Sequence, residues 1–260
     1  MKTMKTISSL LLFTLFVSDA LSQDISAYEI MERVFSIKKP QSSIMEIRLE
    51  VFRKKGKKIK KKIREFIRYE KNYEKGKYRL KSMARFTKPD VVKGTSLLSW
   101  VNNNGKTEQW FFLPKLKSVK KVKAKERSKS FLNTDFIYED LESREPGLDS
   151  LISLGTEFID GQLCKIIMAW PKNESTYFSR KLWINTNNWA IVKIEFYLNE
   201  SKKHKTLQLS DFIERNGFYT PGKLQMETSE GNKTIMHITS YRPDIGLNEE
   251  IFSKSFLVKY

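Results

Sequence analysis

Residues 85–100 read RFTKPDVVKGTSLLSW, and residues 107–141 read TEQWFFLPKLKSVKKVKAKERSKSFLNTDFIYEDL. An NNNG turn at residues 102–105 separates two segments in which apolar and aromatic residues recur at strand-like spacing. Apolar alternation bounded by Asn and Gly turns is typical of half-buried β-strands. The stretch therefore predicts two aromatic-rich strands joined by a hairpin, followed by a basic run and an acidic-aromatic segment.

Alternating strands also account for most of the remaining chain. From residue 43 the apolar period is two, and RKKGKKIKKK at residues 53–62, with eight basic residues in ten, predicts a long hairpin with a basic tip. A solvated hairpin end and a docking site both remain open for this tip. Further turns are expected at residues 160–161, 185–188, 216–217 and 221–222. Turns at hairpin spacing favour one meandering antiparallel sheet over parallel βαβ units.

One helix is expected, over residues 26–38. It begins at Ser26-x-x-Glu29, a capping-box spelling in which each side chain satisfies a free backbone N–H of the other. The following apolar residues fall on one face at helical spacing. We expect this helix to pack on the domain's own sheet.

The first 22 residues have the pattern of a cleavable signal peptide. A lysine-bearing start and an apolar run over residues 7–17 precede the small residues Ala20 and Ser22. The apolar run is too short to cross a bilayer core of roughly 30 Å. We expect cleavage before Gln23, with cleavage after Ala20 as the alternative. The predicted division is a signal peptide at residues 1–22 and an exported domain at residues 23–260.

The charge is strongly positive, with 48 Lys and Arg against 30 Asp and Glu and a net charge of +18. Such a charge can indicate nucleic-acid binding, but an exported protein meets anionic lipid instead. We therefore expect an anionic membrane surface as a partner and no nucleic acid. Cys164 is the single cysteine, so the domain is held together without an internal disulfide, and we expect a buried, inert thiol.

Signatures of catalysis are sparse. His204 and His237 stand alone without a metal-binding neighbour pattern, and no phosphate loop or nucleophile elbow is visible. Asp135, Glu139 and Asp140 could act as acid and base groups, but no His or Cys accompanies them. We expect these carboxylates to fix a loop or to pair with the neighbouring lysines. No cofactor, no metal and no enzymatic activity are predicted.

The spellings F-x-x-P, G-T-x-L-L-x-W, Q-W-x-x-L-P and S-F-x-x-x-D-F-x-Y-E-D-L within residues 85–141 resemble the outer-membrane lipoprotein-sorting family, relatives of the periplasmic carrier LolA. The chain differs at Asn133 and Thr134, where that family usually has a small residue and Ser. Its basic strand is also rich in Lys, where Arg is common in the family. Lys does not offer the planar fork with which Arg binds phosphate.

The resemblance implies a mainly β, α+β fold. It is a single strongly curved antiparallel sheet of about eleven strands, a half-open β-barrel whose apolar concave face is covered by lid helices. It also implies a periplasmic carrier that binds a lipid or lipoprotein acyl chain for transport toward the outer membrane. An inner-membrane lipid-exporting permease would be its donor.

Two sets of candidate site residues follow. The expected lipid-binding residues are those on the presumed inward faces of strands: Phe86, Leu98, Trp100, Trp110, Phe112, Val192, Ile194, Phe196, Leu207 and Leu209. The expected contacts to a lipid head group, membrane or partner are Lys117, Lys120, Lys121, Lys123 and Arg127.

Two alternatives to a carrier stay open. One is a periplasmic sensor or adaptor of the same fold that binds a protein partner. The other is an envelope enzyme acting on a glycolipid, which would require Asp135 or Glu139 in a solvent-connected cleft.

Overall fold

Strands dominate the protein, whose computed structural model describes residues 25–142 and 144–259. The predicted signal peptide lies outside the described residues. Thirteen strands form one antiparallel sheet in the spatial order β6-β5-β4-β3-β2-β1-β15-β14-β11-β10-β9-β8-β7. The predicted mainly β fold with one antiparallel sheet is confirmed, but the strand number of about eleven is too low.

The chain runs through this sheet as two meanders that meet between β1 and β15. The first comprises β1 (Ser42–Lys55), β2 (Lys58–Asn72), β3 (Tyr78–Lys88), β4 (Ser96–Asn102), β5 (Thr107–Leu113) and β6 (Ser118–Lys121). The second comprises β7 (Asp149–Ile159), β8 (Gln162–Pro171), β9 (Ser179–Asn185), β10 (Ile191–Tyr197), β11 (Lys203–Ser210), β14 (Lys223–Thr228) and β15 (Lys233–Pro243). A small hairpin of β12 (Ile213–Arg215) and β13 (Phe218–Thr220) stands apart from the sheet. The hairpins expected at residues 53–62 and 160–161 are confirmed.

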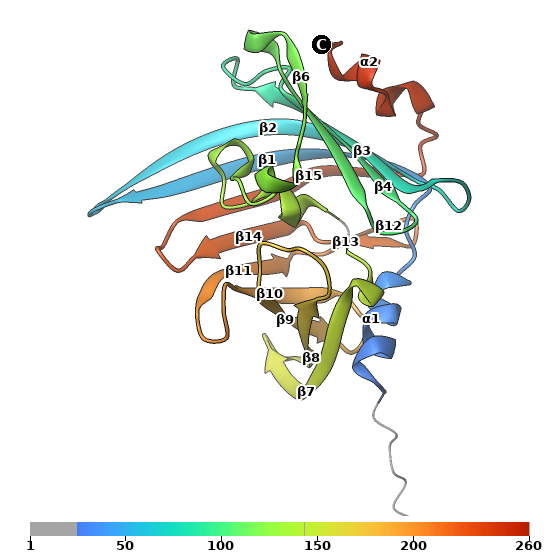
Figure 1. The fold of residues 1–260 in the computed structure, drawn as a ribbon, viewed down its shortest axis with the longest axis vertical. Coiled ribbons are helices and arrows are strands. Elements are labelled where there is room, and N and C mark those ends of the chain that lie inside the picture. The colour runs from blue at the N-terminus through green and yellow to red at the C-terminus, as the bar shows by residue number, and fades with distance from the viewer. Residues whose placement is uncertain (1–24, 143, 260) are drawn as a thin grey trace, which may run out of the picture.

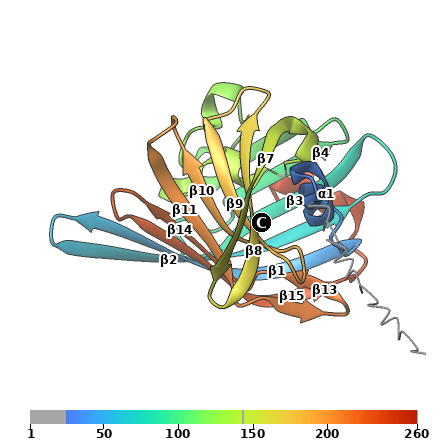
Figure 2. The ribbon, with the colours of Figure 1, turned by 90° about the horizontal axis from the view of Figure 1, so that it is seen from below.

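The sheet curves strongly but does not close, since β6 and β7 are its two free edges (Figures 1 and 2). Alternation gives each strand one side chain inward and the next outward. We call the inner face the one that carries Leu49, Phe86, Phe196 and Met226, which join one buried apolar cluster.

The segment between β6 and β7 folds into short 3-10 turns instead of a further long strand. These turns are η2 (Ala124–Glu126), η3 (Phe131–Asn133), η4 (Tyr138–Leu141) and η5 (Pro146–Leu148), and a similar turn, η1 (Pro114–Leu116), joins β5 to β6. The basic run at residues 115–129 thus contributes only the four-residue strand β6. In Figure 1 this green segment lies across the inner face, and we call its residues 130–141 the lid.

The helix α1 (Ala27–Phe35) begins where the sequence predicted and ends earlier than residue 38. The Ser26 hydroxyl accepts a bond from the Glu29 N–H, and the Glu29 carboxylate accepts the Ser26 N–H at 2.8 Å. Ile30 is fully buried and packs among inner-face residues of β8 and β9. The expectation that this helix packs on its own sheet is confirmed. No helix in the described part of the chain has the length and apolar character needed to span a membrane.

The outer face is covered at one end by the C-terminal segment, η6 (Glu249–Phe252) and α2 (Lys254–Leu257). Phe252 and Leu257 are buried against outward-facing residues of β3, β4 and β5. The Trp100 indole N–H donates to the Phe252 carbonyl at 2.9 Å, which fixes the segment in register. Both faces of this part of the sheet are therefore protein core.

Candidate functional site

A cavity of about 780 Å³ opens on the inner face. Its floor is apolar and comes from β9, β10 and β11, through Leu182, Ile194, Phe196 and Leu207. Its other walls are the β4–β5 turn and the segment that links the lid to β7. Ligand pockets in proteins commonly measure about 300–1,000 Å³, with mostly apolar linings. The cavity therefore has the size and floor of a binding site for a small apolar group.

The lid fills the neighbouring part of the hollow with its own side chains. Phe131 and Phe136 are 4% and 3% exposed. The Phe131 ring lies 6.1 Å from that of Phe86 and 5.6 Å from that of Tyr138, in tilted and edge-on arrangements that aromatic pairs favour. Lid and sheet are therefore packed core over β1 to β5, and the open volume lies beside them over β8 to β11.

A buried ion pair fastens the lid to β11. The Lys205 ammonium donates to the Asp140 carboxylate at 2.6 Å and to the Asp135 carbonyl at 3.0 Å. The two side chains are only 1% and 2% exposed. The Tyr177 hydroxyl donates to the other Asp140 oxygen at 2.7 Å. Burial and the nearby Asp140 charge raise the pKa of Tyr177 well above its ordinary value, so this phenol stays a donor.

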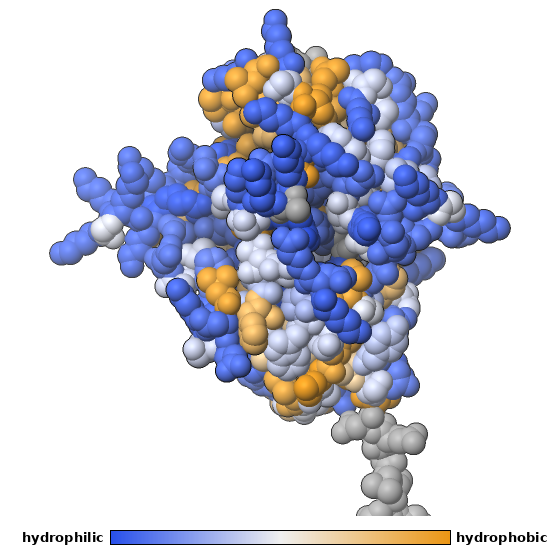
Figure 3. Space-filling view, viewed as in Figure 1, coloured by the Kyte–Doolittle hydropathy of each residue, from blue (hydrophilic) through white to orange (hydrophobic). Residues whose placement is uncertain are grey.

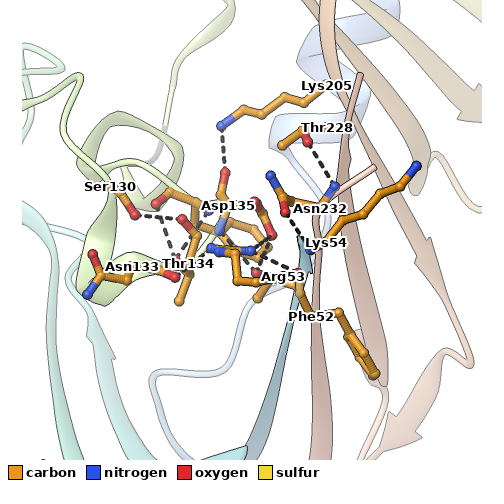
Figure 4. A network of polar contacts seen from close by, with 12 residues as sticks. Phe52, Arg53, Lys54, Ser130, Asn133, Thr134, Asp135, Lys205, Thr228 and Asn232 are labelled. Atoms are coloured by element: carbon orange, nitrogen blue, oxygen red, sulfur yellow. Dashed lines mark hydrogen bonds and ion pairs between the residues drawn. The ribbon is translucent and has the colours of Figure 1, made fainter. Parts of the chain in front are cut away.

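A second anchor ties the lid to β1 and β15, and Figure 4 shows its contact between Arg53 and Asp135. The Asp135 carboxylate accepts the Arg53 guanidinium at 2.8 Å and the Thr234 hydroxyl at 2.6 Å. Thr234 in turn accepts the Asp135 backbone N–H at 3.0 Å. Asp135 and Asp140 are thus structural anchors. The predicted loop fixation agrees with this, but their cationic partners are distant in sequence and are not the neighbouring lysines.

The polar wall of the cavity consists of paired charges. The guanidinium of Arg127 forms a two-pronged pair with Glu142 at 2.9 and 2.6 Å. The Asp149 carboxylate forms ion pairs with the guanidinium groups of Arg144, at 2.7 Å, and Arg180, at 2.9 Å. Bidentate pairs of this kind are geometrically specific. Each of these three arginines therefore has an acidic partner within the protein.

The pKa values of Glu139 and Glu142, two carboxyls in and beside the lid, are shifted in opposite directions. Burial raises the pKa of Glu142, despite its partner Arg127. Burial also acts to raise the pKa of Glu139, but hydrogen bonds from Ser175 and from Thr176 (N–H, 2.8 Å) outweigh it and lower that pKa. Glu139 therefore holds the segment between β8 and β9 as an ionised acceptor.

Five of the ten sequence-predicted lipid-binding residues lie together on the inner face. Ile194, Phe196 and Leu207 line the cavity. Phe86 lies beneath the lid, and Leu209 packs against the same cluster.

The other five face outward, which corrects the presumed inward orientation. Leu98, Trp100, Trp110 and Phe112 pack with the C-terminal segment, because the opposite parity of β4 and β5 sends Leu97 and Phe111 inward.

The fifth outward residue is Val192, in β10. A bulge between Ile191 and Lys193 breaks the alternation there, so Val192 packs with Trp183 on the outer side while Ile191 and Ile194 face inward.

The five predicted cationic contacts comprise four exposed lysines and one arginine that is paired within the protein. Lys117, Lys120, Lys121 and Lys123 are exposed on and around β6. Lys121 pairs with Glu108 at 2.7 Å and lines the cavity mouth. Arg127 is half-buried in its pair with Glu142.

Within residues 25–142 and 144–259 no cluster of three His, Cys, Asp or Glu side chains is placed to hold a metal ion. The acids that the enzyme hypothesis requires, Asp135 and Glu139, are occupied by protein donors.

Comparison with known proteins assigns the chain to a family. A family model described as "Uncharacterized protein"-like matches residues 79–259, well over half of the sequence. The chain belongs to this family. No curated protein matches the sequence.

Solved structures share the fold. A protein described as an outer membrane lipoprotein-sorting protein domain, from Vibrio parahaemolyticus, aligns with a TM-score of 0.83 and 24% identity over 90% of this chain and 98% of that one. A DUF1329 family protein from Desulfovibrio piger gives 0.82 and 24% over 89% and 97%. A LolA superfamily protein from Nitrosomonas europaea gives 0.67 and 20% over 89% and 99%. The resemblance inferred from the motifs is confirmed as a LolA-like fold.

Within this LolA-like fold, the sequence did not reveal the partners that hold the lid. Lys205 stands in the Lys-rich sequence KKHK, and Arg53 begins the basic hairpin run, so composition does not distinguish either from its solvent-exposed neighbours. The local signal is alternation, which places Lys205 on the same face as Leu207 in β11 and Arg53 on the same face as Val51 in β1. A lysine on an apolar face indicates a buried partner.

Proposed function

We propose that the protein carries a lipid, or the acyl chains of a lipoprotein, in the inner-face cavity on the way to the outer membrane. The single observation that supports this most is the cavity of about 780 Å³, with an apolar floor beside an anchored lid. The LolA-like fold agrees with this proposal. A shared fold does not establish a function by itself, so the proposal is argued from the cavity.

Hydrocarbon burial provides the affinity in this proposal. Each buried CH₂ contributes about 0.8 kcal/mol, so a sixteen-carbon chain contributes roughly 12 kcal/mol before ordering costs are subtracted. Each lysine near an anionic membrane adds about 1 kcal/mol, and less as salt screens it. The cavity therefore sets how tightly cargo binds, and the lysines steer the carrier to the membrane surface.

The paired charges bear on which part of the cargo enters. A lipid phosphate inside the cavity would compete with Glu142 for Arg127, or with Asp149 for Arg144 and Arg180. Separating a buried pair leaves an uncompensated charge, at a cost of about 3–5 kcal/mol. We therefore propose that acyl chains enter and that an anionic head group stays at the mouth, where Lys121 lies.

The cellular route completes the proposal. Residues 1–22 direct export to the periplasm, and residues 23–260 form the lipid-binding domain. The β1–β2 hairpin and the lysines around β6 meet the anionic membrane surface. An inner-membrane lipid-exporting permease loads the cargo.

Uptake of a fluorescent fatty acid by the purified protein tests this proposal. We expect Ile194→Trp, which fills the floor of the cavity, to weaken binding at least tenfold. Val192→Trp, two residues away on the outer side, is the matched control and should bind like the wild type. Circular dichroism and urea unfolding establish that both variants are folded.

Native mass spectrometry of protein purified from an envelope fraction detects the cargo directly. Carried lipid should appear as mass adducts in the wild type and be depleted in Ile194→Trp. Ligand-free protein that also takes up no fatty acid would contradict the carrier function.

A further inference from the structure

The two free edges of the sheet differ in length and protection. β6 has four residues, and two of them are the exposed lysines Lys120 and Lys121. β7 has eleven residues, and no strand of the described chain pairs with the edge of β7 that points away from β8. Short, lysine-bearing edges prevent unwanted strand pairing, whereas a long bare edge offers its N–H and C=O groups to another strand.

The β7 edge also exposes large apolar side chains. Ile152, Leu154 and Phe158 are 54%, 47% and 68% exposed. Phe158 lies opposite Leu163 of β8, itself 38% exposed, so the two form one apolar surface across the pair. Figure 3 shows apolar residues gathered at the lower end of the molecule, where Figure 1 places β7 and β8. Exposed apolar area of this kind marks an interaction site.

Charge indicates the kind of occupant. Residues 149–160 contain no Lys or Arg, in a chain with 48 basic residues. Their acids are Glu157, Asp160 and Asp149, of which Asp149 is already paired with Arg144 and Arg180. This edge therefore attracts a basic segment. Pairing of β7 with a second copy of itself would place two edges that carry acids and no Lys or Arg against each other, and like charges opposite each other destabilise a strand pair.

We propose that β7 is a docking strand for another protein. An extended segment of that partner, in which apolar residues alternate with Lys or Arg, adds to the sheet as a fourteenth strand. Main-chain hydrogen bonds supply affinity, and alternate side chains supply specificity, as in other cases of strand addition. The proposal stands on the sheet edge and does not depend on lipid carriage.

A bulge limits how such a segment can pair. The β7–β8 register shifts between Ser153 and Thr156, and Gly155 there has a φ of +91°. Bulges bend an edge and interrupt its ladder. The partner strand can therefore pair with the residues before the bulge or with those after it, but not continuously across it. The same interruption disfavours unlimited growth of the sheet.

A synthetic probe tests the docking strand. The probe is a fluorescent ten-residue peptide that alternates valine and lysine, and its binding is followed by anisotropy. We expect it to bind at least tenfold more tightly than a valine–glutamate peptide or an N-methylated version that lacks alternate N–H donors. Hydrogen exchange of the complex should slow within residues 152–159.

Two matched substitutions complete the test. Phe158→Lys places a cation on the edge and should weaken probe binding at least tenfold. Ile59→Lys changes a side chain that is also 68% exposed, in the β1–β2 hairpin, and should leave binding unchanged. Equal binding by wild type and Phe158→Lys, or hydrogen-exchange protection outside β7, would overturn the proposal. Sedimentation as a dimer that Phe158→Lys abolishes would assign the edge to a second copy and would also overturn it.

Discussion

Replacing Lys205 with Met should destabilise the protein strongly, because Lys205 forms a buried ion pair with Asp140. Met keeps most of the side-chain length but removes the ammonium, which donates at 2.6 Å to Asp140 and at 3.0 Å to the Asp135 carbonyl. Asp140 would then keep the Tyr177 hydroxyl and the Ile137 N–H as donors and lose its cation. Its carboxylate would be a buried charge without a counterion.

The magnitude follows from burial. With side chains 1% and 2% exposed, neither Lys205 nor Asp140 can recover hydration when the other is removed. Breaking such a pair costs about 3–5 kcal/mol, whereas replacing both partners by apolar residues is often neutral. For a domain of this size about 1 kcal/mol corresponds to 2–4 °C, so Tm should fall by roughly 6–20 °C.

Urea unfolding of four proteins measures the effect. They are the wild type, Lys205→Met, the double variant Lys205→Met/Asp140→Leu, and the control Lys203→Met. Lys203 is half exposed and pairs with Glu195 at 3.3 Å, so its loss should cost about 0–1 kcal/mol. The double variant should recover part of the loss, because it removes the uncompensated charge but also takes the acceptor from the Tyr177 hydroxyl and the Ile137 N–H. A cost below about 1 kcal/mol for Lys205→Met, or a double variant less stable than the single one, would refute the buried-pair reasoning.

Three further predictions concern the lid and the two faces of the sheet. Phe131→Ala should cost about 3–5 kcal/mol, because it leaves a cavity beside the Phe86 ring, as measured by urea unfolding. Leu257→Ala should cost about 2–5 kcal/mol and detach the C-terminal segment, seen as faster hydrogen exchange there. Because the pKa of Glu139 is lowered, its stabilising effect is present above the ordinary value of 4.5 and is lost as the pH falls below it. The unfolding free energy of Glu139→Gln should therefore depend less steeply on pH below 4.5 than that of the wild type, and equal slopes would contradict this role.

Much of the fold could be predicted from local pattern. The period of two after residue 43, the capping box at Ser26 and the Asp160-Gly161 turn each depend on near neighbours, and the structure has each of them. The strand number of about eleven came from the resemblance to the family, and local pattern could not correct it, because a short strand such as β6 carries only one apolar residue. A pattern that short does not distinguish a strand from a loop.

The two faces of the sheet were harder to assign. Both Leu97 and Leu98 are apolar and buried, so alternation in β4 could not show which of them faces inward. The C-terminal segment makes the outer face apolar as well, and only tertiary structure reveals that covering. In β10 the bulge at Val192 shifted the parity of its neighbours, and nothing in the local sequence indicated it.

The ladder between β1 and β15 has a consequence for how the chain folds. It pairs Ser43 with Pro243 and Phe52 with Lys233, and it alone joins the two meanders in the sheet. Contacts between such distant positions require loop-closure entropy before they provide stability, which slows folding. β1 gains its second neighbour only when the last strand has been synthesised. A nascent chain that ends before residue 233 can pair β1 to β6 and β7 to β14 but cannot join the two sets, so the final cooperative step awaits synthesis of β15.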